Sequence, residues 1–125
     1  MPDQEKVLFV DDEENILHAF VRLMRKETGV STVVTTSPAE ALALLRRDRF
    51  ALIVSDLRMP ALDGISLLEQ ASSAAPATVR MIVTGHADLK TVIDAINRGA
   101  AWRFLTKPWD DDELRLVVSQ GVLQY

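Results

Sequence analysis

The sequence predicts an α/β fold in which helices cover both faces of a doubly wound parallel sheet. Short, almost continuous apolar runs recur along the chain, and such runs are typical of strands buried on both faces. Helical patterns lie between these runs, so that strand and helix alternate five times, which favours parallel pairing with right-handed crossovers. With 125 residues, of which 48% are hydrophobic, the chain has the size and composition of one globular domain.

Five segments are predicted as strands. Most are runs of three or four apolar residues, and the second is rich in β-branched residues, which favour strands. The fifth is short and lies between Gly99, a helix-stop signal, and Pro108, a breaker. The predicted strands are 7–10, 30–35, 52–54, 81–83 and 102–105.

Five segments are predicted as helices. In the first, apolar residues from Ile16 to Met24 recur at spacings of three and four. In the second, Ser37 is an N-cap, Pro38 takes the first helical position and Glu40 completes a capping box. The third and fourth helices are predicted at 64–74 and 88–98, and the fifth follows the N-cap candidate Asp110 and carries Leu114, Val117 and Val118.

Net charge and composition argue against several classes of binding partner and site. A net charge of −4 argues against direct nucleic-acid binding, which depends on Lys and Arg neutralising many phosphates. The chain has no cysteine, which excludes disulfides, thiolate nucleophiles and thiolate metal sites. It shows neither a signal-like start nor an apolar stretch of bilayer length. We therefore expect a cytoplasmic protein without a membrane partner.

Polar residues follow four of the five predicted strands. In open parallel sheets, ligands bind outside the carboxyl ends of the strands, and these positions hold Asp11 and Asp12, Asp56, Thr84 and Lys107. Three carboxylates at one edge repel one another unless a cation offsets the repulsion. Because all of the ligands are oxygen atoms, the expected ion is Mg²⁺.

This set of residues also suits phosphoryl transfer. A carboxylate such as Asp56 can attack phosphorus when cations neutralise the transferring oxygens. Lys107 can supply a mobile positive charge, and the hydroxyl of Thr84 can donate a hydrogen bond. Taken one at a time, these residues are equally typical of a capped turn, a strand end and a surface cation. Their joint occurrence, in order at the ends of the strands, favours the site.

The same residues resemble a known family. The motifs Asp11-Asp12, Asp56-Leu57-Arg58-Met59-Pro60 with Gly64, Thr84-Gly85 and Lys107-Pro108 are similar to those of the response-regulator receiver domain, over almost the whole chain. The resemblance implies a flavodoxin-like (βα)5 three-layer sandwich with strand order 2-1-3-4-5. It makes 1–125 one receiver domain, with 1–5 as a short N-terminal tail.

The resemblance also implies a function in two-component phosphorelay signalling. Asp56 would accept a phosphoryl group, with Mg²⁺, from the phosphohistidine of a sensor histidine kinase or a histidine phosphotransfer protein. The domain would catalyse only its own phosphorylation and slow dephosphorylation, and so would not be an enzyme. The implied metal ligands are Asp12, Asp56 and the backbone carbonyl of Arg58, with Asp11 acting mainly through water. The peptide before Pro108 would be cis.

Further implications concern the output of the domain. Thr84 and Phe104 would be the switch residues, and the readout face would comprise the fourth helix, the fifth strand and the fifth helix. The controlled output domain would lie outside this chain, and the segments 84–88 and 104–109 resemble receivers joined to HD-type phosphodiesterase modules. A homodimer stays open, as does a partner patch at Trp102 and Trp109. His86 and Arg58 are candidates for tuning the dephosphorylation rate.

Three rival functions fit part of this pattern. A haloacid-dehalogenase-like phosphatase needs a second Asp two residues after the nucleophile, and Arg58 stands there. A flavodoxin-like cofactor binder needs a phosphate-cradling loop after the first strand, where the acidic run 11–14 would repel phosphate. A receiver turned constitutive interaction module stays open.

Overall fold

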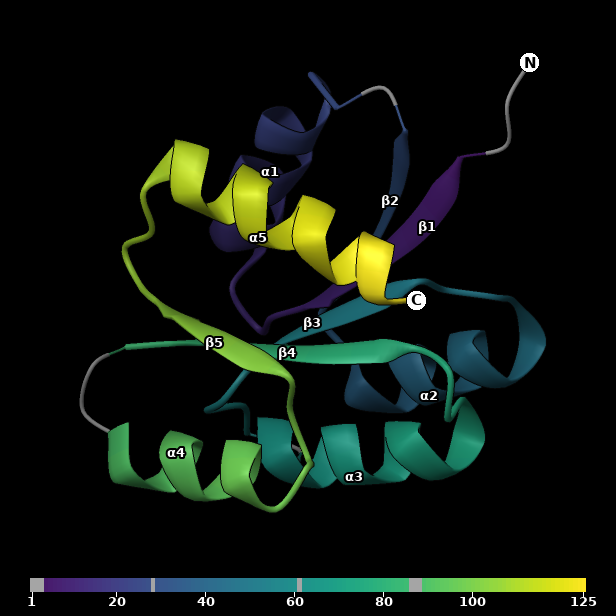
Figure 1. Ribbon diagram of the computed structural model, residues 1–125, viewed down its shortest axis with the longest axis vertical. Coiled ribbons are helices and arrows are strands. Elements are labelled where there is room, and N and C mark those ends of the chain that lie inside the picture. Colours follow the sequence, from purple (N-terminus) through teal and green to yellow (C-terminus); the bar gives the residue numbers. More distant parts are fainter. Residues whose placement is uncertain (1–3, 28, 61, 86–88) are drawn as a thin grey trace.

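The computed structural model describes residues 4–27, 29–60, 62–85 and 89–125. Strands and helices alternate along the whole of this chain (Figure 1). The elements are β1 (Glu5–Val10), α1 (Glu14–Met24), β2 (Val30–Thr35), α2 (Pro38–Arg47), β3 (Leu52–Asp56), α3 (Gly64–Ala74), β4 (Val79–Thr84), α4 (Leu89–Asn97), β5 (Arg103–Thr106) and α5 (Asp111–Gln124).

The five strands form one parallel sheet in the order β2-β1-β3-β4-β5, which confirms the predicted topology. Helices α1 and α5 lie on one face of the sheet, and α2, α3 and α4 lie on the other (Figure 1). From β1 the chain first adds β2 on one side, and it then adds β3, β4 and β5 in turn on the other side. All strands point the same way, so their carboxyl ends share one edge of the sheet.

The core consists of two apolar layers separated by the sheet. Side chains alternate between the faces along each strand. Val7 and Phe9 join the layer under α1 and α5, whereas Leu8 and Val10 join the layer under α2, α3 and α4. Phe9 packs against Phe20 of α1, with ring centroids 4.4 Å apart. Burial on both faces explains why the strands appear in the sequence as continuous apolar runs.

Helix caps agree with the sequence prediction. The hydroxyl of Ser37 accepts a hydrogen bond from the backbone N–H of Glu40 at 3.1 Å, with Pro38 in the first turn of α2. A carboxylate oxygen of Asp110 accepts from the N–H of Glu113 at 2.9 Å. The caps therefore set where α2 and α5 begin.

Some boundaries differ from those predicted. β1 begins at Glu5, whose N–H donates to the carbonyl of Gly29, so the last residue of the expected tail 1–5 is part of the strand. β3 and β4 extend beyond their apolar runs to Asp56 and Thr84. The start predicted for the fourth helix, Asp88, lies outside the described residues. Among the described residues, no helix is long and apolar enough to span a bilayer.

Candidate functional site

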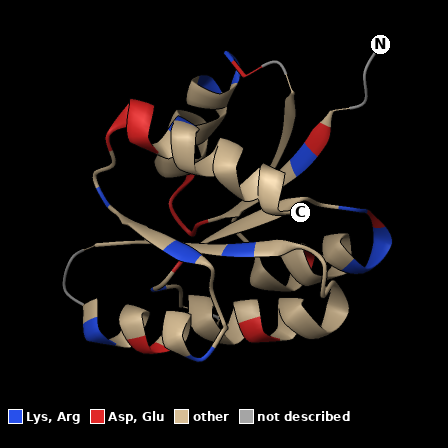
Figure 2. Cartoon of the chain, viewed as in Figure 1, with Lys and Arg blue, Asp and Glu red and all other residues tan. Residues whose placement is uncertain are grey.

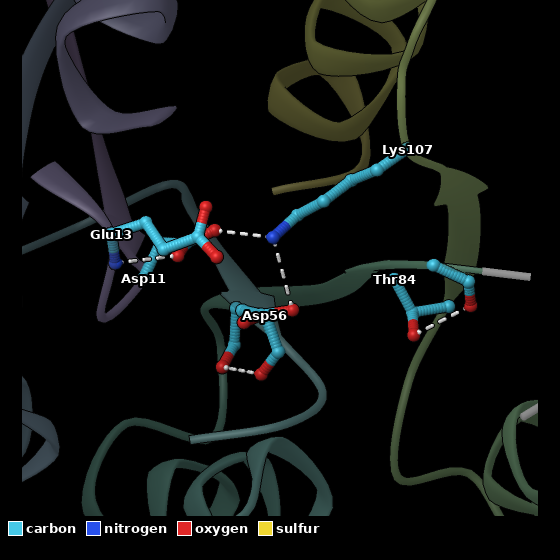
Figure 3. Close-up of polar contacts among 7 residues, drawn as sticks. Asp11, Glu13, Asp56, Thr84 and Lys107 are labelled. Carbon is cyan, nitrogen blue, oxygen red and sulfur yellow. Dashed lines mark hydrogen bonds and ion pairs between the residues drawn. The ribbon is translucent and has the colours of Figure 1, made fainter. Parts of the chain in front are cut away.

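The predicted site residues gather at the carboxyl edge of the sheet. Asp11 directly follows β1, Asp56 ends β3, Thr84 ends β4 and Lys107 directly follows β5. Figure 3 shows the Lys107 side chain reaching toward Asp11 and Asp56, with Thr84 on the far side of Asp56 from Asp11. Parallel register explains this meeting, because Asp56 pairs with Val83, the residue before Thr84.

Three carboxylates lie together at this edge. Each of Asp11, Asp12 and Asp56 offers an oxygen atom within 4.8 Å of those of the other two. Asp11 is fully buried and Asp56 is 6% exposed, whereas Asp12 is exposed. Figure 2 shows acidic residues filling the loop that joins β1 to α1. Most carboxylates are solvated, so two buried ones at a single edge require compensation.

Lys107 supplies part of that compensation. Its Nζ lies 2.7 Å from Oδ2 of Asp11 and 3.2 Å from Oδ1 of Asp56. Burial alone would lower the pKa of Lys107, but the ion pairs with Asp11 and Asp56 outweigh it and raise that pKa above its ordinary value. One ammonium group faces three carboxylates, so the cluster keeps an excess of negative charge.

The pKa of Asp56 is raised above its ordinary value. Burial is the largest cause, and the charge of Asp11 adds to it, while the ion pair with Lys107 opposes both. The charged form of Asp56 is therefore held in an environment that disfavours it. The N–H of Glu13 donates to Oδ1 of Asp11 at 2.9 Å and so orients that carboxylate. The Ser55 hydroxyl donates to the backbone carbonyl of Asp56 at 2.9 Å and so holds the main chain at the end of β3.

The donor set fits a divalent cation of the magnesium type. Hard oxygen ligands, an excess of negative charge and one exposed member suit an ion that keeps several of its waters. Among the described residues, no histidine stands in the cluster, so the soft or imidazole-rich environment that zinc and copper prefer is not provided. Asp11, Asp12 and Asp56 each offer a carboxylate oxygen to such an ion, and Asp11 is also engaged by Lys107 and by the N–H of Glu13.

The loop after β3 is held tightly against Asp56. The N–H of Gly64 donates to the carbonyl of Leu57 at 2.8 Å, and Asp63 caps α3 by accepting from the N–H of Ser66 at 2.9 Å. A Cβ atom at Gly64 would lie 2.2 Å from the carbonyl oxygen of Asp56. A glycine is therefore needed for this close approach.

The expected switch residues occupy different environments. Thr84 is buried, and its hydroxyl donates to the carbonyl of Gly85 at 3.0 Å. Phe104 is half-buried against the apolar layer that contains α4. The peptide between Lys107 and Pro108 is cis, as the family resemblance implied, and the N–H of Lys107 donates to the Thr84 carbonyl at 2.7 Å.

The remaining candidates lie around this centre. Arg58 is exposed, and His86 lies outside the described residues. Trp102 and Trp109 are half-buried in the layer under α1 and α5, where the ring of Trp109 lies 6.2 Å from that of Phe9. Much of each tryptophan thus serves the core, and a partner patch there stays a prediction.

Two contributors were missed by sequence reasoning. Gly64 was noted only as part of a motif, although its place at the first turn of α3 brings it against Asp56. Ser55 was not singled out, yet it is a fully buried hydroxyl inside an apolar strand. A polar residue in such a run is a signal, because buried hydroxyls need partners.

Comparison with known proteins gives a consistent result. A model of the response regulator receiver domain matches residues 7–119. The hydrogenase transcriptional regulatory protein HoxA of Cupriavidus necator is 36% identical over 119 residues, which is 95% of this chain and 24% of HoxA. The alginate biosynthesis transcriptional regulatory protein AlgB of Pseudomonas putida is 39% identical over 118 residues, which is 94% of this chain and 26% of AlgB. The chain thus spans about a quarter of the length of these curated relatives.

Solved structures show the same fold. An uncharacterized protein from Neptuniibacter caesariensis superposes with a TM-score of 0.92 at 39% identity, covering 98% of this chain and 91% of that one. The signal receiver domain of an HD domain-containing protein from Pseudomonas fluorescens Pf-5 gives a TM-score of 0.89 at 33% identity, covering 98% and 90%.

Proposed function

Because the chain belongs to the response regulator receiver domain family of two-component signalling, we propose that Asp56 accepts a phosphoryl group and that its phosphorylation changes one face of the domain. The observation that carries this proposal is the buried Asp56 carboxylate beside Lys107, Asp11 and Asp12 at the carboxyl edge of the sheet. This arrangement combines a nucleophile with the positive charge and metal ligands that phosphoryl transfer requires.

Asp56 acts as the nucleophile. A carboxylate oxygen attacks the phosphorus of a phosphohistidine, and an acyl phosphate forms as the P–N bond of the donor breaks. The electron pair of that bond leaves with the imidazole, which takes up a proton and is released as neutral histidine. The pKa of Asp56 is raised mainly because burial removes solvent from its carboxylate. A poorly solvated carboxylate is a better nucleophile than a fully solvated one.

Lys107 and Thr84 receive the transferred group. Lys107 already contacts Oδ1 of Asp56 at 3.2 Å, and its flexible stem lets the ammonium group move to a phosphoryl oxygen. The Thr84 hydroxyl donates to the carbonyl of the next residue, a local bond that it can exchange for one to phosphate. Both contacts are stronger when the acceptor is charged.

The metal site supports the same step. When bound, Mg²⁺ would neutralise charge on the transferring oxygens. We assign Asp12, Asp56 and the backbone carbonyl of Arg58 as its protein ligands, with Asp11 acting through water. The close oxygens of the three carboxylates support this assignment.

Thr84 and Phe104 carry the signal outward. A hydrogen bond from Thr84 to phosphate would favour one of two packings of Phe104 in the layer that contains α4, and so shift an existing population. Phe104 is half-buried, so its ring is not enclosed by the core on every side. The surface that changes comprises α4, β5 and α5.

The partners follow from this role. The phosphoryl donor is a sensor histidine kinase or a histidine phosphotransfer protein, and residues 1–125 are one receiver domain whose output lies in another domain or partner. Several curated relatives are named transcriptional regulatory proteins, which makes a transcriptional output the first to test. Arg58, standing where a phosphatase needs its second acid, argues against turnover of an external substrate.

The proposal is tested by chemical phosphorylation. The protein is incubated with acetyl phosphate and Mg²⁺, or with EDTA in place of Mg²⁺, and its intact mass is measured. We expect one added phosphoryl group that requires Mg²⁺ and is absent from Asp56→Asn. A matched control is Asp63→Asn, which keeps an oxygen atom to cap α3 and should be phosphorylated. No added mass in the wild-type protein would instead favour a constitutive interaction module.

A further inference from the structure

Arg80 makes an unusual set of contacts at the end of the sheet opposite to the candidate site. Its Nε donates to the carbonyl of Ala100 at 3.1 Å, Nη2 to that of Gly99 at 3.1 Å and Nη1 to that of Thr78 at 3.3 Å. The side chain is half-buried. No ion pair joins it to a carboxylate among the described residues, so backbone carbonyls are the acceptors that compensate its burial.

The two carbonyls of Gly99 and Ala100 belong to the turn that ends α4. The N–H of Gly99 donates to the carbonyl of Ile96, and that of Ala100 donates to Ala95. Together with the positive φ of 80° at Gly99, this pattern is a Schellman motif. The backbone hydrogen bonds of this motif end α4, and Arg80 binds the carbonyls of Gly99 and Ala100, which follow the helix.

Among the described residues, α4 makes a small apolar contact with the domain, to which the half-buried Ile96 also contributes. Among its described residues only Val92 and Ala95 are buried, and both pack in the layer that contains Ile82. Leu89 and Ile93 are exposed. A helix with so small an apolar contact depends on its end attachments more than one that is packed along its whole length.

Arg80 and the expected switch residue Thr84 lie on the same face of β4. Side chains of a strand alternate between its faces, so Arg80, Ile82 and Thr84 all face α4. Four residues of parallel strand separate Arg80 from Thr84 by about 13 Å. The Thr84 end of the strand lies at the carboxyl edge, and Arg80 lies near the opposite edge.

We propose that Arg80 is a positioning residue that anchors the C-terminal end of α4 to β4, so that phosphorylation moves α4 as a pivot about this end. The part of the inference that concerns phosphorylation rests on the proposed function. The burial that lowers the pKa of Arg80 agrees with a guanidinium group held within the protein. The anchor confines the response to the N-terminal half of the helix, next to Thr84.

The test is amide hydrogen exchange followed by mass spectrometry. Wild type is compared with Arg80→Met, which keeps an apolar stem without donors, and with Arg80→Lys, which keeps the charge but cannot bridge three carbonyls. Arg98→Met is the matched control, since Arg98 is exposed at the same corner and its side chain makes no hydrogen bond or ion pair within the described ranges. Amides of β1 and β3 report global stability.

Without phosphorylation, we expect residues 94–101 to exchange about tenfold faster or more in Arg80→Met. The increase should be smaller in Arg80→Lys and absent in Arg98→Met, with β1 and β3 unchanged. Equal exchange at 94–101 in wild type and Arg80→Met would overturn the anchor.

The phosphorylated arm uses acetyl phosphate and Mg²⁺. In wild type, the change in exchange should stop within residues 89–93, and in Arg80→Met it should extend to residue 100. A change along the whole of α4 in wild type would overturn the pivot. If wild type gains no phosphoryl group, the proposed function fails, while the unphosphorylated comparison still decides whether Arg80 anchors α4.

Discussion

At the scale of single residues, the arrangement of carboxylates that suits Asp56 to phosphoryl transfer also lowers the stability of the folded domain. Asp56 is buried beside Asp11, and both effects raise its pKa. A carboxyl group whose pKa is higher in the folded than in the unfolded state destabilises the fold wherever it is ionised in both states. Lys107 offsets part of this cost, and it also pairs with Asp11 at 2.7 Å.

Asp56→Asn should therefore stabilise the metal-free domain. The substitution removes the disfavoured charge, and Lys107 keeps its ion pair with Asp11. In EDTA at neutral pH we expect Tm to rise by roughly 4 °C, the shift that about 1 kcal/mol produces in a domain of this size. Asp48→Asn, outside the cluster, loses only a solvent-exposed ion pair with Lys6 at 3.8 Å, which contributes little to stability, and should leave Tm nearly unchanged. A lower Tm for Asp56→Asn would mean that its pair with Lys107 outweighs the repulsion.

Gly64→Ala should destabilise the domain through a steric effect. Its Cβ atom would meet the Asp56 carbonyl oxygen at 2.2 Å, and backbone atoms cannot move aside as a side chain can. We expect a loss of about 1–3 kcal/mol in the free energy of unfolding, measured in urea with an unchanged m value. Gly29→Ala is the control, because no atom lies within 4 Å of a Cβ there. Equal stabilities for the two variants would contradict the close approach.

The sequence predicted which residues meet at the site but not how they divide their contacts. Strand ends in a parallel sheet place Asp11, Asp56 and Lys107 together, whatever the details of packing. That Lys107 lies nearer to Asp11 than to Asp56 depends on side-chain conformations, which no pattern encodes. Arg80 was missed because an arginine at a strand edge ordinarily faces solvent, and its carbonyl partners come from a turn about twenty residues later.

At the scale of the elements, local signals fixed helix starts better than strand ends. The predicted third helix, 64–74, agrees with α3, since Asp63 and Gly64 provide local cues. β4 begins at Val79, two residues before its apolar run, because pairing with β3 continues through Val79 and Arg80. Pairing partners are distant in sequence, so propensity alone does not define these ends.

Asp110→Ala should weaken α5 through loss of its N-cap. Oδ1 of Asp110 accepts from the N–H of Glu113 at 2.9 Å, and losing such a cap costs about 1 kcal/mol. The decrease should appear in the free energy of unfolding from urea titration. Asp110→Asn keeps the acceptor but removes the charge, so it should stay close to wild type. If both variants lost the same stability, the charge rather than the cap would be responsible.

At the scale of the whole molecule, the sheet lies between two apolar layers and carries the charged site residues at the carboxyl ends of its strands. The layer under α1 and α5 and the layer under α2, α3 and α4 bury both faces of the strands, which fixes their relative positions. Carboxylates from the ends of β1 and β3 are thereby held within reach of one another. The proposed cation site would consequently exist only in the folded chain, since the unfolded chain does not bring Asp12 and Asp56 together.

Mg²⁺ should therefore stabilise the domain by mass action. A ligand that binds only the folded state adds about 1.4 kcal/mol at ten times its Kd, and Tm should rise with Mg²⁺ concentration by roughly 6 °C at that point. EDTA should reverse the rise. Asp12→Asn should abolish most of it, because it removes an exposed ligand from the cluster, while Asp48→Asn should keep it. The measurement is a thermal melt at several Mg²⁺ concentrations and constant ionic strength, so that screening does not contribute. A rise of equal size in both variants would place the ion elsewhere and refute the assigned ligands.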